Sequence, residues 1–180
     1  RFAVTLQDLR TVTLLRRQLS QERSRSRPWL KVRRNRGVST EWHRGWQGLL
    51  RFPVSRLTRI VSLAIIAGLC QVAMYNGTTA AIVGSGLALF ILGLELCEPL
   101  AQEIDQGERT DAYPKIRGVM YLSLLTSTGA ICIPVVGIMV ATMGLAEPKI
   151  WSVAAICAIP AVLGGLIGAA INIVSGAPDQ

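Results

Sequence analysis

The sequence predicts an all-α membrane protein, a polytopic bundle of about four transmembrane helices that follows a basic N-terminal helical arm. Three long segments without Asp, Glu, Lys or Arg support this fold class: residues 60–94, 118–146 and 150–178. A helix needs about 20 apolar residues to cross a bilayer. Soluble helices usually present a polar stripe to water, whereas these segments carry only scattered Ser, Thr, Asn and Gln.

The first uncharged segment is too long for one helix, and Asn76-Gly77-Thr78-Thr79 interrupts it with residues typical of turns. We therefore expect two short spans, about 58–75 and 79–96, joined by a hairpin; a partly re-entrant pair is the alternative. The other two segments predict one span each, 118–145 and 150–175. The transmembrane domain is then 53–180, with an inner loop at 97–117.

Charge is distributed unevenly along the chain. Residues 1–59 hold fifteen Lys and Arg against three Asp and Glu, whereas residues 60–180 hold four against eight. The positive-inside rule assigns the basic end to the cytoplasm, and four spans return the C-terminus to the same side. Residues 1–52 are therefore expected to form a cytoplasmic or interfacial arm, in which residues 5–23 have the spacing of an amphipathic helix.

Residues 41–59, which lead into the first span, combine aromatic, aliphatic and basic side chains. This mixture predicts a segment in the headgroup layer that contacts anionic lipid. The candidate interface residues are Trp42, Trp46, Arg44, Arg51, Arg56 and Arg59. The alternative is a positively charged anchor without a specific partner. Nucleic acid is not an expected partner, because the Arg-Ser run lacks a platform of stacking aromatic residues.

The inner loop contains the pattern of a short amphipathic helix. Leu96, Leu100 and Ile104 share one helical face, and Gly107 is typical of a helix end. Such a helix between spans is a candidate docking element for a soluble partner; a solvated connector is the alternative. Its candidate contact residues are Glu98, Gln102, Glu103 and Asp105. Glu95 and Glu98 are also the acids nearest membrane depth, where a coupling or proton role and a plain interfacial position are both open.

The run Glu-Pro-Leu-Ala-Gln-Glu-Ile-Asp (98–105), followed by Asp-Ala-Tyr-Pro-Lys-Ile-Arg-Gly (111–118), resembles the inner loop of actinobacterial ABC-2-type exporter permeases. Leu-Leu-Arg-Phe-Pro-Val-Ser-Arg (49–56) and Leu-Arg-Thr-Val-Thr-Leu-Leu-Arg-Arg-Gln-Leu (9–19) also resemble parts of such proteins. The resemblance covers most of residues 1–120. It implies a permease component in a bacterial plasma membrane, whose loop 95–113 couples a separate ATP-binding subunit to substrate export.

Permeases of that group usually have more spans than the four expected here. The resemblance therefore also implies that this chain is a fragment of a longer permease, packed against other transmembrane helices from the rest of that permease or from a second copy. The alternative function is a non-transporting membrane scaffold whose basic arm binds anionic lipid or a protein partner.

The sequence predicts neither an enzyme nor a cofactor or metal site. It contains no phosphate-binding loop motif, so ATP hydrolysis would have to come from another subunit. Its four cysteines are dispersed and are interpreted as small packing residues. Small residues at a spacing of four instead predict a helix-packing row on the last span, made of Gly164, Gly168 and Asn172, with Ala161, Gly165 and Ala169 one step round the helix.

Overall fold

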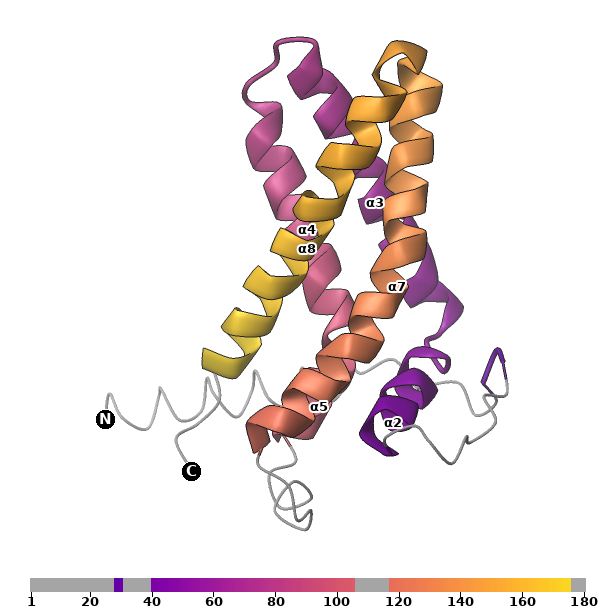
Figure 1. Ribbon diagram of the computed structural model, residues 1–180, viewed down its shortest axis with the longest axis vertical. Coiled ribbons are helices and arrows are strands. Elements are labelled where there is room, and N and C mark those ends of the chain that lie inside the picture. Colours follow the sequence, from indigo (N-terminus) through magenta and orange to yellow (C-terminus); the bar gives the residue numbers. More distant parts are fainter. Residues whose placement is uncertain (1–27, 31–39, 106–116, 176–180) are drawn as a thin grey trace, which may run out of the picture.

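The computed structural model describes residues 28–30, 40–105 and 117–175. This part of the chain is helical and contains no strand, which confirms the predicted all-α class for it (Figure 1). The predicted arm helix at residues 5–23 lies outside the described residues, as does the second half of the inner loop. In chain order the elements are α2 (Thr40–Leu49), α3 (Val54–Tyr75), α4 (Ala81–Leu96), α5 (Glu98–Asp105), α7 (Arg117–Ala146), the 3-10 turn η1 (Pro148–Ile150) and α8 (Trp151–Ser175).

Three helical segments are long and apolar enough to cross a membrane: Val54–Tyr75, Gly118–Ala146 and Pro148–Ser175. The fourth candidate is the pair α4 and α5, which passes the same test only when taken together and is bent by 56° at its break. The described residues therefore hold three such helices, or four if the bent pair forms one span. The first predicted span begins earlier than expected, at Val54, because Pro53 precedes it with a φ of −65° that suits a helix start.

The four long helices form a ring in which each contacts two neighbours. α3 packs against α4 and α7, and α8 packs against the same two helices from the other side (Figure 1). Consecutive long helices run in opposite directions. The α3–α4 turn and η1 therefore lie at one end of the bundle, the hairpin end, whereas α2 and α5 lie at the other, the α2–α5 end.

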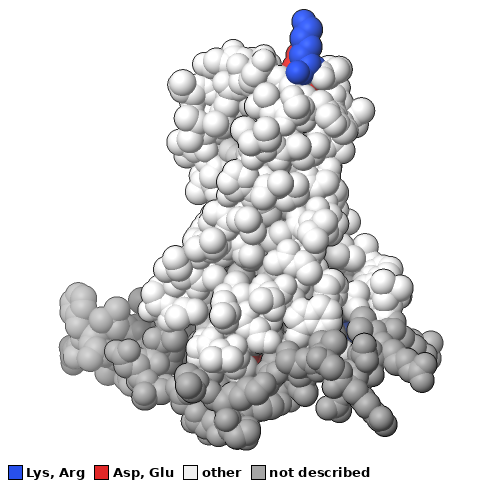
Figure 2. All heavy atoms as spheres, viewed as in Figure 1, with Lys and Arg blue, Asp and Glu red and all other residues white. Residues whose placement is uncertain are grey.

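The interior of the bundle follows the helical repeat of the sequence. On α7 the buried side chains recur every three or four residues, at Leu124, Thr128, Cys132, Val135 and Met139. The outward faces are apolar as well, since Ile133 and Ile156 are each 73% exposed. Figure 2 shows one long side of the molecule without charge between its two ends. Helices that are apolar on all sides are typical of a membrane environment.

Two glycines determine how closely α4 and α8 approach each other. A Cβ atom added to Gly93 would lie 2.5 Å from the carbonyl oxygen of Gly165, and one added to Gly165 would lie 2.7 Å from that of Leu89. Both positions are closer than a real Cβ contact, so only glycine allows the two backbones to cross here.

The predicted packing row on α8 faces elsewhere. Gly164 and Asn172 are exposed, and a Cβ on Gly168 would reach only Phe90, at 3.9 Å. The contact within this chain is instead made one step round the helix by Gly165 and Ala169, because α8 turns that row toward α4. Packing of the predicted row against a helix from outside this chain stays a prediction.

Candidate functional site

Two arginines and two glutamates meet at the α2–α5 end, and we call this group the charge cluster. Arg56 and Arg59 lie in the first turns of α3, Glu95 is in the last turn of α4, and Glu98 begins α5. The Nε atom of Arg56 is 2.9 Å from Oε2 of Glu95, and its Nη2 atom is 3.6 Å from Oε2 of Glu98. The Nε atom of Arg59 is 3.3 Å from Oε1 of Glu95.

The members of the charge cluster differ in exposure. The side chains of Arg56, Glu95 and Glu98 are 16%, 19% and 21% exposed, whereas that of Arg59 is 48% exposed. The guanidinium of Arg56 also lies 4.9 Å from the centroid of the buried Phe52 ring, within the range of a cation–π contact. Nε of Arg56 and Oε2 of Glu95 are not aligned for a hydrogen bond, so their contact is a charge pair. Partial burial weakens screening by water, which strengthens this pair relative to one on an open surface.

A proline explains why α4 ends where the charge cluster forms. Pro99 has no N–H, so the carbonyl of Glu95 loses the donor that would continue the helix, and the proline ring crowds that carbonyl. The amide of Cys97 still donates to the carbonyl of Gly93 at 2.9 Å, and the amide of Ala101 donates to that of Cys97 at 3.0 Å. Cys97 is fully buried at the break itself.

α5 is amphipathic, as the sequence predicts. Leu100 and Ile104 are buried, whereas Gln102 is exposed and donates from Nε2 to Oε1 of Glu98 at 3.1 Å. Glu103 is half-buried. The side chain of Asp105, the fourth predicted contact residue, lies outside the described part. Although α5 has only eight residues, it contacts α2, α4, α7 and α8.

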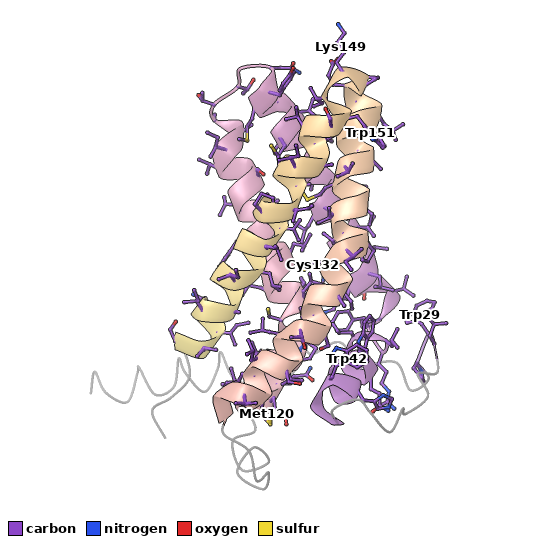
Figure 3. The ribbon with its side chains drawn as sticks, viewed as in Figure 1. Trp29, Trp42, Met120, Cys132, Lys149 and Trp151 are labelled. Atoms are coloured by element: carbon purple, nitrogen blue, oxygen red, sulfur yellow. The ribbon has the colours of Figure 1, made fainter. Side chains whose placement is uncertain are left out.

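α2 packs on the outside of α7 at the same end. Gly45 sits directly against the hydroxyl of Ser127, so α2 can come this close only without a side chain at that position. Trp42 and Trp46 form an edge-to-face pair on α2, with ring centroids 5.7 Å apart. Both are half-buried (Trp42 is labelled in Figure 3).

The predicted lipid-contact residues are placed unequally. Arg51 is exposed, and the side chain of Arg44 lies outside the described residues. Arg56 is directed to carboxylates of its own chain rather than to the surface, and Arg59 is shared between the cluster and the surface. Lipid contact by Arg51, Arg59 and the two tryptophans stays a prediction.

The pairing within the charge cluster was not among the predictions from the sequence, although the sequence holds a signal for it. Arg56 and Arg59 are three residues apart, as are Glu95 and Glu98, and the two pairs are nearly equidistant from the Asn76–Thr79 turn. An antiparallel helical hairpin brings such positions opposite each other. Trp29 was also missed: its indole Nε1 donates to the carbonyl of Phe52, and its amide to that of Leu50, both at 3.0 Å.

The described residues hold no group of three His, Cys, Asp or Glu side chains that could bind a metal ion. His43 exchanges a hydrogen bond of 3.1 Å with Gln47 on the same helix. Comparison of the chain with protein-family models, curated proteins and solved structures gave no match to any of them.

Proposed function

We propose that this chain is a membrane-embedded permease component of an ABC-type exporter, located in a bacterial plasma membrane with both termini in the cytoplasm. The observation that carries the proposal is the position of α5. This short charged helix lies at the end of an apolar bundle and contacts four other helices.

The apolar helices support a membrane location, and the arginines support the orientation. The arginines with described side chains, Arg51, Arg56 and Arg59, lie between α2 and the first turns of α3, at the α2–α5 end. Lys149 lies at the hairpin end (Figure 3). Basic residues gather on the cytoplasmic side of membrane proteins. The α2–α5 end is then cytoplasmic, and α5 is accessible to a soluble subunit.

Coupling through α5 requires that a displacement of α5 by a partner also moves the long helices of the bundle. Its buried Leu100 and Ile104 belong to the main core of the bundle, whereas its exposed Gln102 is available to a partner. α5 is joined to α4 through Cys97 without an intervening loop. A partner that binds α5 differently in two of its own states would therefore bias the position of α4. ATP hydrolysis is assigned to that partner, because the chain lacks a phosphate-binding loop motif.

The test is capture of an ATP-hydrolysing subunit encoded next to this chain. The proposal places the acidic residues of α5 against a basic surface of that subunit. The double substitution Glu103→Lys and Asp105→Lys would put like charges opposite each other there, and should reduce capture by about tenfold. Lys149→Glu, at the hairpin end, is the matched control and should leave capture unchanged. Equal capture by all three proteins would contradict coupling through α5.

The second candidate is a non-transporting membrane scaffold. It is favoured by the edge-to-face tryptophans of α2 and by the exposed Trp29 and Leu30 at the same end, which suit anchoring in a headgroup layer. Two results together would favour the scaffold over the permease component. No ATP-hydrolysing subunit is captured, and the α2–α5 end of the chain binds phosphatidylglycerol in nanodiscs.

A further inference from the structure

The break between α4 and α5 separates two pieces that together have the length and composition of one span. α4 has 16 residues, about 24 Å at 1.5 Å per residue, which is short of a hydrocarbon core of about 30 Å. With α5 added, the pair passes as a single membrane-spanning segment, yet it is bent by 56°. Pro99 explains why the helix breaks, but a break alone does not fix the angle between its two halves.

One guanidinium contacts both halves. Arg56 reaches Glu95 on the α4 side of the break with Nε and Glu98 on the α5 side with Nη2. Arg59, one turn further along α3, pairs with Glu95 on the α4 side of the break. Arg56 thus joins three helices, α3, α4 and α5, at the point where the chain bends.

We propose that Arg56 is a clasp: it holds the bend between α4 and α5 by bridging Glu95 and Glu98, and thereby keeps α5 in its place on the bundle. Loss of the bridge frees α5 to swing toward the axis of α4. The bridge involves residues of this chain alone, so its test does not depend on whether the proposed ATP-hydrolysing partner exists.

The native thiol at the break provides the readout. Cys97 is fully buried, as are the flanking Leu96 and Leu100. Straightening the 56° bend about Cys97 would displace Gln102 by about 7 Å, and we expect this movement of α5 to expose the break. Site-resolved maleimide labelling of the full chain in lipid nanodiscs, read by peptide mass spectrometry, then measures how often Cys97 is uncovered. Cys70, half-buried on α3 near the hairpin end, is the internal reference for general unfolding.

Arg56→Gln should raise the labelling rate of Cys97 about tenfold, and Glu98→Gln should do nearly the same, since each removes a partner from the half-buried bridge. Glu98→Gln leaves Arg56 paired with Glu95, so it keeps the test valid if Arg56→Gln does not fold. Arg59→Gln is the matched control and should change the rate by about twofold or less, as expected for a half-exposed pair.

Arg56→Lys separates bridging from charge. A lysine keeps the positive charge but lacks the planar fork that reaches two carboxylates, so its Cys97 labelling should approach that of Arg56→Gln. Three results would overturn the clasp: wild-type labelling of Cys97 in both Arg56→Gln and Glu98→Gln, an equal rise in Arg59→Gln, or a parallel rise at Cys70.

Discussion

The two ends of the bundle are closed by different kinds of interaction. At the hairpin end, backbone hydrogen bonds between near neighbours close both turns: the amide of Asn76 donates to Val72 at 3.0 Å, and that of Ile150 donates to Glu147 at 3.1 Å. At the α2–α5 end, contacts between residues far apart in the sequence add to the backbone hydrogen bonds: the ion pairs of the charge cluster, and the packing of Gly45 against the side chain of Ser127.

This difference determines which end can rearrange. Opening a turn closed by its own backbone requires local unfolding, because the freed N–H and C=O groups must find other partners. An end closed by side chains can exchange one set of contacts for another while every helix stays intact. The α2–α5 end is therefore the end at which a partner, a lipid or a substitution can change the structure without unfolding it.

The largest expected effect tests the side-chain closure. Gly45→Ala should lower the free energy of unfolding by about 2 kcal/mol, since the new Cβ would meet the Ser127 hydroxyl and lie 3.0 Å from its Cβ atom. Unfolding in mixed detergent micelles gives the energy, and hydrogen exchange should show lost protection in α2 but not at the hairpin end.

Gly48→Ala is the matched control on the same helix. Its Cβ would lie 3.6 Å from Pro99, an ordinary contact, and alanine favours the helix by up to about 1 kcal/mol. If the two alanine substitutions have the same effect, the Gly45 contact does not hold α2 in place.

An intermediate effect is expected from the backbone at the hairpin end. Gly77 has a φ of +93° and open space around its absent side chain, so Gly77→Ala tests backbone conformation alone. It should cost about 1 kcal/mol in the same unfolding assay. Gly86→Ala, also in open space but within α4, should be neutral or stabilising. A neutral Gly77→Ala would mean that the turn is not held in this conformation.

The smallest effect is expected from charge at the hairpin end. Lys149→Ala should change the free energy of unfolding by less than about 0.5 kcal/mol, because Lys149 is exposed. If its cost instead equals or exceeds that of Gly77→Ala, side-chain charge contributes to closure at this end too, and the contrast between the two ends disappears.

Most of the architecture could be predicted from the sequence, because it depends on local signals. The uncharged segments locate the long helices, and Asn76-Gly77 locates the turn between α3 and α4. The spacing of Leu100 and Ile104 correctly indicates the amphipathic α5, whereas Leu96 lies before the break, at the end of α4.

The contact partners of individual side chains were harder to predict from the sequence, because they depend on how each helix is rotated about its axis relative to its neighbours. Gly164 and Gly165 belong to adjacent rows that are both rich in small residues, and the sequence does not say which row meets α4. In the sequence, nothing distinguishes Arg56 from other arginines near the start of a span. Its role as a bridge follows only from the packing of α3 against α4. The sequence therefore indicates an interfacial arginine, and only the packed helices reveal a bridging one.

The unequal lengths of the helices have a consequence for the surrounding lipid. α7 has 30 residues, about 45 Å, and stands in the same ring as α4, which is about 24 Å long. If the ring spans a bilayer, one hydrocarbon thickness cannot match both lengths at once, so we expect the bilayer to thin beside α4 while α7 tilts or extends past the hydrocarbon. In such a bilayer, a change of lipid chain length would act most strongly where α4, the shortest helix of the ring, ends at its break with α5.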